Sequence, residues 1–349
     1  MLTFLIMAGG SGERFWPLST KKKPKQLLKV FSDKSLIRLT YERILPLVSK
    51  EQIFIATNEI QVDALKADLT ELPDDRIIIE PMFRDTAAAI AYGSMIISKY
   101  YENPVICVLP SDALIQNEEE FRKVVKIALD DALKGNIVTF GMTPTYPETG
   151  YGYIEALNPV KNIPTKSLGF REKPKYEIAE EYVKSGNFLW NSGMFTFRHD
   201  VILEALKKHS PNHYETISKI DKLITKNEGL KTAQISKELF PLFEKKSIDF
   251  AVMEHADNID VIPASFGWND VGNYTAFEEL FDRDDNGNVV RNVNTIFVDS
   301  NNNIIVSDSN VQRVSLLGVN DMVVAVTKDE IMICPKNRNQ EIKKIIQKL

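Results

Sequence analysis

Thr3-Phe4-Leu5-Ile6-Met7-Ala8-Gly9-Gly10-Ser11-Gly12-Glu13-Arg14 is the stretch that decides the fold, because an apolar run leads directly into a glycine-rich loop. The first five of these residues predict a β-strand. Glycine lets the backbone approach a ligand without a side-chain clash, so the loop amides can surround phosphate oxygens. The loop is not a Walker loop, because no Gly-Lys-Ser/Thr ends it, and Phe15 replaces the third glycine of the dinucleotide fingerprint. We expect it to bind phosphate; a flexible strand-to-helix turn is the alternative.

From this first strand onward, short apolar runs alternate with helical patterns. The expected strands are 3–7, 52–57, 77–80, 105–110 and 137–141, and the expected helices are 35–47, 59–69, 86–101 and 118–134. This alternation is typical of an α/β, Rossmann-like, mostly parallel sheet with helices on both faces, which binds ligands at the carboxyl ends of its strands. The turn-rich segment 143–153 and helical stretches around 176–185 and 200–209 then indicate an insertion large enough to hold a substrate.

The helical periodicity of the sequence stops at the turn cluster Asp285-Asn286-Gly287-Asn288. Short apolar runs separated by Asn, Asp, Ser and Gly follow it, and the chain ends in an amphipathic stretch. The expected strands are 293–298, 303–306, 311–317, 322–326 and 330–333, with a helix over 338–349. We therefore expect a catalytic domain over 1–285 and a small β module over 286–349. The runs have no strict repeat, so the sequence neither demonstrates nor excludes a solenoid.

Composition narrows the classes of partner and compartment. The 349 residues are 44% hydrophobic and 26% charged, and 43 Lys and Arg against 48 Asp and Glu give a net charge of −5. There is no basic excess for nucleic acid, no apolar run long enough to cross a membrane, and too few cysteines, two, for a disulfide framework. These features favour a cytoplasmic protein that binds neither nucleic acid nor membrane. His209 and His213 have the spacing of one helix face, which a metal site could use, but we expect a solvated surface there rather than a zinc site.

Positive charge is nevertheless concentrated directly after the glycine loop. Arg14, Lys21, Lys22, Lys23 and Lys25 place five cations within 12 residues. The run of three lysines fits a solvated charged surface. Lys25 differs because it lies between a proline and an apolar run, so we expect its side chain to be held in place.

Further segments along the chain extend the pattern of the glycine loop and of Pro24-Lys25-Gln26-Leu27. They are Glu80-Pro81, Arg84-Asp85-Thr86-Ala87, Leu109-Pro110-Ser111-Asp112, Pro147-Glu148-Thr149-Gly150-Tyr151-Gly152-Tyr153-Ile154, Phe170-Arg171-Glu172-Lys173-Pro174, Trp190-Asn191-Ser192-Gly193-Met194-Phe195 and Trp268-Asn269-Asp270-Val271-Gly272. Together they resemble the sugar-phosphate nucleotidyltransferases over nearly the whole chain, and most of all the mannose-1-phosphate guanylyltransferases. Where this family commonly has Thr, the chain has Glu13, so we expect that carboxylate to point away from the phosphates.

The resemblance implies a glycosyltransferase-A-like catalytic domain, with a left-handed β-helix as a possible form of the C-terminal module. It implies transfer of GMP from GTP to α-D-mannose 1-phosphate, which gives GDP-mannose and pyrophosphate. In this reaction Arg14 and the loop amides would hold the β- and γ-phosphates, and Lys25 would hold the α-phosphate. Mg²⁺ would be the cofactor, bound by Asp112 and Asp270. Each of these aspartates, considered alone, is more often a turn former or a helix cap; the resemblance reverses that preference.

Glu80 is the candidate reader of the base. Guanine presents N1–H and an exocyclic amino group side by side, and one carboxylate can accept both, whereas uracil and thymine suit an amide better. Glu80 ends an expected strand, and Asp85 and Thr86 follow it as further candidate nucleotide contacts. An ordinary exposed glutamate at a strand end is the alternative.

Sugar hydroxyls call for carboxylate, amide and backbone partners. Glu172 and Asn191 fit, Gly152 would leave room for the ring, and Lys173 would meet the sugar phosphate. The alternatives are a salt-bridged Glu172–Lys173 edge and an Asn191 that only shapes a turn.

Two rival functions remain open at this point: transfer to a different sugar 1-phosphate, and a catalytically idle relative that binds nucleotide sugars. Some relatives carry an isomerase domain after the transferase, which we do not expect here because the chain ends too soon for one. The apolar strands after residue 286 need a covering surface, and related enzymes dimerise through such a piece, so we expect a homodimer.

Overall fold

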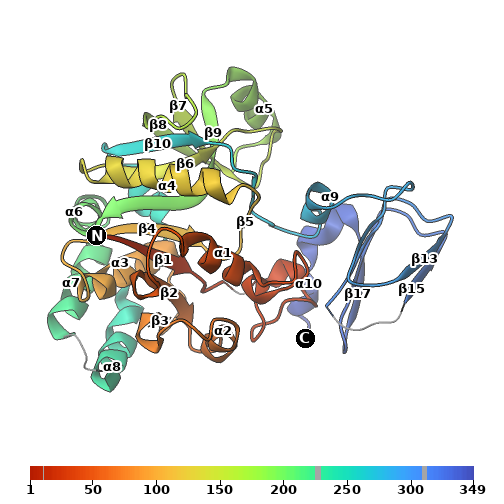
Figure 1. The fold of residues 1–349 in the computed structure, drawn as a ribbon, viewed down its shortest axis with the longest axis horizontal. Helices are drawn as coiled ribbons and strands as arrows, with labels where there is room; N and C mark the ends of the chain where they lie inside the picture. Colours follow the sequence, from red (N-terminus) through yellow and green to blue (C-terminus); the bar gives the residue numbers. More distant parts are fainter. Residues whose placement is uncertain (11, 225–228, 309–312) are drawn as a thin grey trace.

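The larger part of the chain is built on one mixed β-sheet (Figure 1). The computed structural model describes the whole chain except residues 11, 225–228 and 309–312. In the described residues the sheet has nine strands, in the order β3-β2-β1-β4-β9-β6-β10-β8-β7. They are β1 (Leu2–Met7), β2 (Ile53–Asn58), β3 (Ile77–Glu80), β4 (Val105–Pro110), β6 (Ile137–Met142), β7 (Gly152–Ala156), β8 (Thr165–Glu172), β9 (Phe188–Arg198) and β10 (Ile259–Ala264).

Helices cover both faces of this sheet, because successive residues of a strand point to opposite sides. In β1, Phe4 and Ile6 share a core with α1, α2 and α4, whereas Leu5 shares one with α3, α6 and α7. The α-helices of this part are α1 (Leu36–Ile44), α2 (Val62–Asp68), α3 (Asp85–Ser98), α4 (Glu118–Ala132), α5 (Tyr176–Ser185), α6 (His199–His209), α7 (Pro211–Leu223), α8 (Gly229–Leu239) and α9 (Ala276–Leu280). The predicted α/β fold is confirmed.

The sheet is less parallel than the sequence predicts. Strands β3, β2, β1 and β4 run parallel, as do β6 and β10, but β9 lies antiparallel between β4 and β6. Strands β7 and β8 add further antiparallel pairs at the edge. The four strands β7 to β10 were not predicted from the sequence. Polar and glycine positions interrupt the apolar residues of β7, β8 and β9, and Asp260 and Pro263 interrupt those of β10.

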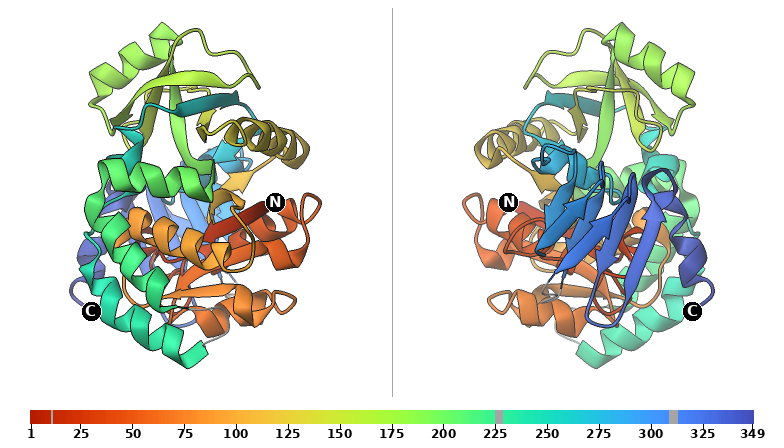
Figure 2. Two further views of the ribbon diagram at one scale, coloured as in Figure 1. Left: turned by 90° about the vertical axis from the view of Figure 1, so that its left-hand side faces the viewer. Right: turned by 90° about the vertical axis from the view of Figure 1, so that its right-hand side faces the viewer.

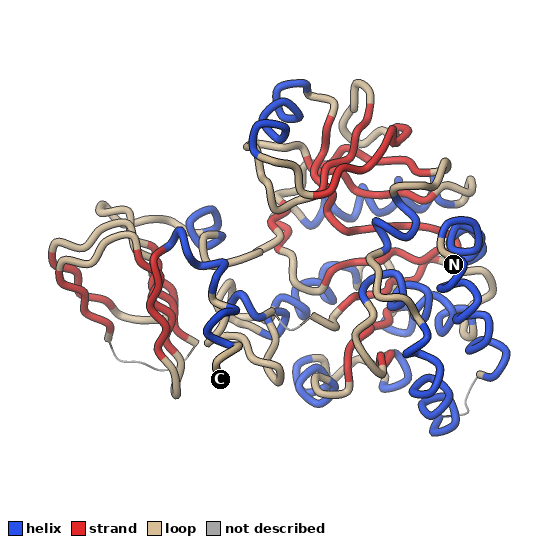
Figure 3. Tube along the Cα trace, turned by 180° about the vertical axis from the view of Figure 1, so that it is seen from behind, coloured by secondary structure: helices blue, strands red, loops and turns tan. Residues whose placement is uncertain are grey.

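The module after residue 286 is a stack of short parallel strands. Strands β12 (Val289–Arg291), β14 (Ile304–Ser307) and β16 (Met322–Val326) pair in parallel, and β17 (Ile331–Pro335) adds an antiparallel edge. A second parallel stack is formed by β13 (Thr295–Val298) and β15 (Val314–Leu317). Figure 2 shows the strands of the module side by side, and Figure 3 shows the two stacks on opposite sides of it. The predicted strand at 311–317 lies partly outside the described residues.

Stacked asparagines hold successive turns of this module together. The side-chain oxygen of Asn288 accepts from the backbone N–H of Asn303 at 2.9 Å, and that of Asn303 accepts from the N–H of Met322 at 3.0 Å. Each buried amide therefore pairs with the next turn, which gives the small module hydrogen bonds that its short strands lack. The predicted C-terminal helix is broken into a 3₁₀ helix (Lys336–Glu341) and α10 (Lys343–Ile346).

One face of the four-stranded stack packs on the segment that follows the glycine loop. Phe15 and Phe31 from that segment share a core with Phe277 and with module residues such as Ile304 and Val323. The rings of Phe31 and Phe277 are stacked at 4.8 Å between centroids, and those of Phe15 and Phe31 meet edge to face at 5.7 Å. The predicted boundary between 285 and 286 stays a prediction, but the two parts share this core.

Several large apolar side chains of the module are exposed. They are Ile296, Val298, Leu317, Ile331 and Ile333. The predicted homodimer stays a prediction. His209 ends α6 and His213 lies on α7, where it is fully buried, so their predicted place on one solvated helix face is wrong. Among the described residues, no helix is long and apolar enough to cross a membrane.

The shared aromatic core predicts that the module stabilises the catalytic part. A Phe31→Ala variant should lose about 3–5 kcal/mol of unfolding free energy, because it removes the ring that contacts both Phe15 and Phe277. Chemical denaturation measures the loss. Leu317→Ala, which truncates a side chain that is 75% exposed, is the control and should leave stability nearly unchanged. Equal effects of the two substitutions would contradict this packing.

Candidate active site

Two adjoining cavities lie at the carboxyl edge of the parallel strands. The first, here called the nucleotide cavity, has a volume of about 250 Å³ and is lined by Gly9, Gly10, Glu80, Thr86 and Asp112 among others. The second, the sugar cavity, has a volume of about 280 Å³; its lining includes Thr86 again, with Gly152, Glu172, Asn191, Asp249 and Asp270. Strands β1, β3 and β4 end at the first cavity, which is where a parallel sheet is expected to place its ligand.

The carbonyl groups of the glycine loop are held by surrounding side chains. The oxygen of Ala8 accepts from Gln26 at 2.8 Å and from Thr57 at 3.1 Å, and that of Gly10 accepts from Gln61 at 3.1 Å. The oxygen of Gly12 accepts from Ser19 at 2.6 Å. These acceptors are satisfied within the protein, so the loop can offer its N–H groups to an anion. Ser11, a predicted contact, lies outside the described residues.

Gly12 is required where the loop meets Lys25. Its φ is +62°, and a Cβ at this position would lie 2.4 Å from the Cβ and 2.7 Å from the backbone nitrogen of Lys25. Any other residue would be strained and would displace the lysine. The loop and Lys25 are therefore fixed against each other.

Lys25 is a buried cation between the two predicted metal ligands. Its side chain is 7% exposed, its Nζ donates to the carbonyl oxygen of Asp270 at 2.7 Å, and it forms an ion pair with Oδ2 of Asp112 at 2.9 Å. Lys21 and Lys22 are exposed, and Lys23 pairs with Asp308 at the surface. The prediction that Lys25 is held while its neighbours are solvated is confirmed.

Asp112 and Asp270 are brought together by a two-stranded sheet. Strand β5 (Leu114–Ile115) pairs with β11 (Trp268–Asn269); Asp112 lies two residues before β5, and Asp270 directly follows β11. Burial raises the pKa of the Asp270 carboxyl; Lys25 and Arg14 oppose this shift, and Asp112 adds to it. Within the described residues no group of three or more His, Cys, Asp or Glu could hold a metal. Two carboxylates nonetheless fit Mg²⁺, which commonly takes one or two from the protein and completes its shell with phosphate oxygens and water.

Arg14 and Glu13 are both exposed. A Cβ placed on Gly272 would lie 3.2 Å from Oδ2 of Asp270 and 3.9 Å from Nη1 of Arg14, so the guanidinium lies at the Asp270 end of the site. Glu13 is not among the residues that line the nucleotide cavity. Its predicted orientation away from phosphate stays a prediction.

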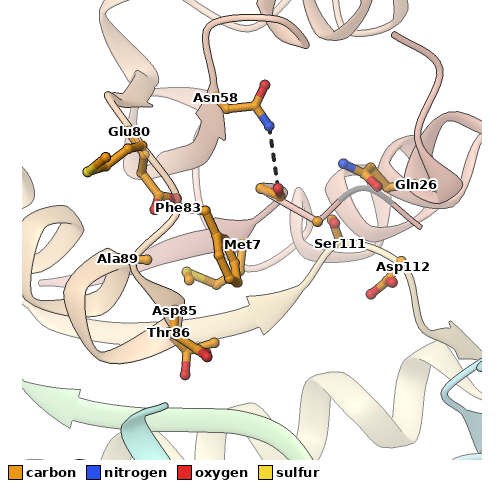
Figure 4. Close-up of a pocket in the computed structure, with 13 residues that line it drawn as sticks. Met7, Gln26, Asn58, Glu80, Phe83, Asp85, Thr86, Ala89, Ser111 and Asp112 are labelled. Carbon is orange, nitrogen blue, oxygen red and sulfur yellow. Dashed lines mark hydrogen bonds between the residues drawn. The ribbon is translucent and has the colours of Figure 1, made fainter. Parts of the chain in front are cut away.

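Glu80 is a buried carboxylate without a partner. It is 7% exposed, and no other described residue forms a hydrogen bond or ion pair with its carboxylate. Burial raises its pKa to about 7. Figure 4 shows Glu80 and Asp112 on opposite sides of the nucleotide cavity. The predicted alternative, an exposed glutamate at a strand end, is wrong, because β3 carries Glu80 into the interior.

The N-terminus of α3 connects the two cavities. Asp85 has a φ of +68°, and its Oδ1 accepts from the N–H of Thr86 at 2.8 Å. The hydroxyl oxygen of Thr86 accepts from the N–H of Ile248 at 2.8 Å, which ties the helix to the segment before η6, a π-helix (Asp249–Met253). Thr86 therefore lines both cavities from a fixed position.

Gly152 and Glu172 line one wall of the sugar cavity, whereas Lys173 lies beside Glu172 and is not among the residues that line this cavity. A Cβ on Gly152 would lie 2.7 Å from Oε2 of Glu172, so glycine leaves the space that this carboxylate occupies. The other oxygen, Oε1, pairs with the exposed Nζ of Lys173. The structure thus contains the salt-bridged edge that the sequence left open, while Oε2 of Glu172 remains at the cavity.

Asn191 has both of its polar groups engaged by the protein. Its Oδ1 accepts from the N–H of Gly193 at 3.0 Å, and its Nδ2 donates to Oδ1 of Asp249 at 2.8 Å. Asp249 was not predicted from the sequence, because no motif or spacing marks it and only the fold brings η6 to β9. Tyr151 completes this wall, with its ring 5.4 Å from that of Trp190 and 5.3 Å from that of Trp268.

Comparisons with known proteins agree with this arrangement. Residues 3–287 match the family described as "Nucleotidyl transferase", and residues 293–349 match the "MannoseP isomerase/GMP-like beta-helix domain". The mannose-1-phosphate guanylyltransferase RfbM of Salmonella typhimurium is 38% identical over 99% of this chain and 72% of its own length. A mannose-1-phosphate guanylyltransferase of Salmonella montevideo is 37% identical over 100% of this chain and 74% of its own length.

Among solved structures, a Thermus thermophilus protein described as a "mannose-1-phosphate geranyltransferase" superposes with a TM-score of 0.88. It is 33% identical, and the match covers 99% of this chain and 98% of that one. The chain therefore belongs to the nucleotidyl transferase family, as the sequence resemblance predicts. Within it, the chain groups with the mannose-1-phosphate guanylyltransferases that carry a C-terminal β-helix domain.

Proposed function

We propose that the protein transfers GMP from GTP to α-D-mannose 1-phosphate, with GDP-mannose and pyrophosphate as products. The observation that carries the proposal is the buried ammonium of Lys25, which contacts the carboxylate of Asp112 at the nucleotide cavity and the carbonyl oxygen of Asp270, a residue of the sugar cavity. An oxygen of the sugar phosphate would attack the α-phosphorus in line. The bond from that phosphorus to the bridging oxygen breaks, and pyrophosphate leaves without a covalent enzyme intermediate.

The reaction brings two polyanions together, so charge neutralisation is the main task of the site. Lys25 would meet the α-phosphate, and Arg14 with the amides of Gly9 and Gly10 would hold the β- and γ-phosphates. Mg²⁺ bound by Asp112 and Asp270 would supply Lewis-acid neutralisation of phosphate charge. The support from the chain itself is the convergence of these cationic and anionic groups in an otherwise acidic protein.

Lys25 has the properties of a preorganised donor. Its contacts with Asp112 and Asp270, together with the close approach of Gly12, hold the ammonium in one place before substrate binds. A donor that is already oriented costs little reorganisation when charge develops on the phosphate, which is why such groups stabilise transition states effectively.

Glu80 would read guanine. A buried carboxylate with no partner lacks hydrogen-bond donors, and guanine supplies two adjacent N–H donors to one carboxylate. Glu80 lies across the nucleotide cavity from Asp112, so a base at one side leaves its phosphates free to extend toward the metal ligands (Figure 4). Asp85 and Thr86 line the same cavity and would contribute contacts to the nucleotide.

On the sugar side, Glu172 and Asn191 would contact hydroxyls, Lys173 would meet the sugar phosphate, and Gly152 would make room for the ring indirectly, by leaving space for the Glu172 carboxylate beside it. The ion pair that Lys173 and Glu172 form in the ligand-free protein is compatible with this role, because an exposed pair of this kind costs little free energy to rearrange.

The activity is tested by release of pyrophosphate with a panel of triphosphates and sugar 1-phosphates. GTP with mannose 1-phosphate and Mg²⁺ should give the highest kcat/KM. Higher kcat/KM with glucose 1-phosphate would indicate a different sugar. Nucleotide-sugar binding with no turnover on any pair would indicate an idle binding protein.

The role of Lys25 predicts a loss of turnover when its charge is removed. Lys25→Met should lower kcat by roughly 10²–10³-fold, since one preorganised donor to the reacting phosphate is lost. Lys22→Met removes the same charge from an exposed neighbour and should leave kcat within about twofold. Steady-state kinetics at saturating GTP and mannose 1-phosphate provide the measurement. Normal kcat for the Lys25 variant would exclude this role.

The role of Glu80 predicts pH-dependent recognition of guanine. Free Glu80 has a pKa of about 7, so the fraction that is ionised falls as the pH drops below 7, and a protonated carboxyl cannot accept both guanine N–H groups. GTP affinity should therefore weaken from pH 8 to pH 6. Glu80→Gln should bind GTP with less selectivity over other triphosphates and without this pH dependence. Calorimetric titration at several pH values measures both effects, and a variant that retains both the selectivity and the pH dependence would rule Glu80 out.

A further inference from the structure

Hydrogen bonds with another element of the fold fix the position of Asp249. It is the first residue of η6, and short π-helical segments of this kind often occur at functional sites. The segment before it is pinned to the start of α3, where Ile248 donates to the Thr86 hydroxyl at 2.8 Å and Ala87 donates to the carbonyl oxygen of Lys246 at 3.2 Å. The position of the Asp249 carboxylate is thus set by the nucleotide side of the site as well as by its own helix.

Asp249 stands at the boundary between the sugar cavity and a wider, more open cavity of about 700 Å³, here called the outer cavity. Glu172 and Thr86 line both spaces as well, whereas Lys246 and Glu254 line only the outer one. A sugar ring in the sugar cavity would therefore have the carboxylates of Glu172 and Asp249 at the same wall.

The hydrogen bonds already formed at this wall show which acceptors remain for a ligand. Asn191 uses its oxygen for Gly193 and one N–H for Asp249 Oδ1, so it holds Asp249 in place. Glu172 uses Oε1 for Lys173. Oε2 of Glu172 and Oδ2 of Asp249 form no hydrogen bond with another described side chain, and both residues line the sugar cavity. Burial raises the pKa of Asp249, the negative charge of Glu172 raises it further, and the hydrogen bond from Asn191 opposes both.

We propose that Asp249 is a specificity-determining residue whose carboxylate accepts a hydrogen bond from one hydroxyl of the bound sugar 1-phosphate, next to a second hydroxyl read by Glu172. Asn191 is then chiefly a positioning residue that orients Asp249. The inference rests on the proposed transfer to a sugar 1-phosphate and extends it to the residue that selects among sugars. A site built to accept from a hydroxyl discriminates strongly against an analogue without it, because the buried acceptor is left unpaired.

The test compares wild type and Asp249→Asn with mannose 1-phosphate and its 2-, 3-, 4- and 6-deoxy analogues. In wild type, the loss of the hydroxyl read by Asp249 should lower kcat/KM on the order of 10–100-fold. Asp249→Asn keeps the size and can still accept from Asn191, but it lacks the charge. With this variant the penalty for that one analogue should shrink to within about threefold, while the penalties for the other analogues and the KM for GTP stay unchanged.

Glu254→Gln is the matched control. Glu254 is exposed, lies in the same segment and lines the outer cavity but not the sugar cavity, so the substitution removes the same charge without touching the proposed contact. Its deoxy-sugar profile should match that of wild type. A changed profile would mean that the electric field of the surrounding charges, rather than a contact by Asp249, sets the preference among sugars, and it would overturn the inference.

A second measurement needs only the wild-type protein. A carboxylate needs a donor, so at each hydroxyl that it reads the deoxyfluoro analogue, which cannot donate, should lose as much as the deoxy analogue. Two positions should behave in this way, one for Glu172 and one for Asp249. Fewer than two such sugar positions would overturn the inference. So would an Asp249→Asn variant that retains the penalty in kcat/KM for every deoxy analogue, or that reduces all of these penalties equally. Absence of wild-type turnover overturns the proposed function instead.

Discussion

The ion pair between Lys25 and Asp112, with the second contact from Lys25 to the Asp270 carbonyl, is the interaction on which the rest of the site depends. It joins three parts of the chain: the segment after the glycine loop, the end of β4 and the turn after β11. A buried charge must be paired, and removing one member of such a pair is strongly destabilising. The need to pair this ammonium therefore keeps the loop, Asp112, Asp270 and the wall of the sugar cavity in one arrangement.

The same physical constraint divides the site into two kinds of groups. Lys25 and Asp112 satisfy each other in the free protein, whereas Glu80 is buried without a partner and Asp249 has one side-chain partner among the described residues. Groups that pair with each other set the geometry in advance. Carboxylates that lack donors from the protein can accept hydrogen bonds from a ligand with suitably placed N–H or O–H groups. In the proposed function, geometry and selectivity are thus carried by different residues.

Much of this could be predicted from the sequence where local pattern carries the information. The first strand, the glycine loop and the distinct position of Lys25 after Pro24 follow from residue types and spacing, and the structure confirms them. The pairing of β5 with β11 could not be predicted, because two-residue strands have no periodicity. Asp249 was missed for a related reason: its role depends on contacts with Asn191 and on the α3 terminus, which are distant in sequence. The mixed pairing of β9 likewise follows from tertiary packing.

The aromatic core around Phe31 also bears on how such chains can be divided. Two family descriptions meet between residues 287 and 293, which suggests separable pieces, but Phe15, Phe31 and Phe277 form one core with the strands of the β module. Cutting the chain at that junction would expose this core directly beside the segment that carries Lys25. The two segments are therefore separate in the family comparison, but they are not independent folding units. Exchange of the module between relatives would have to preserve the surface that packs on the segment after the glycine loop.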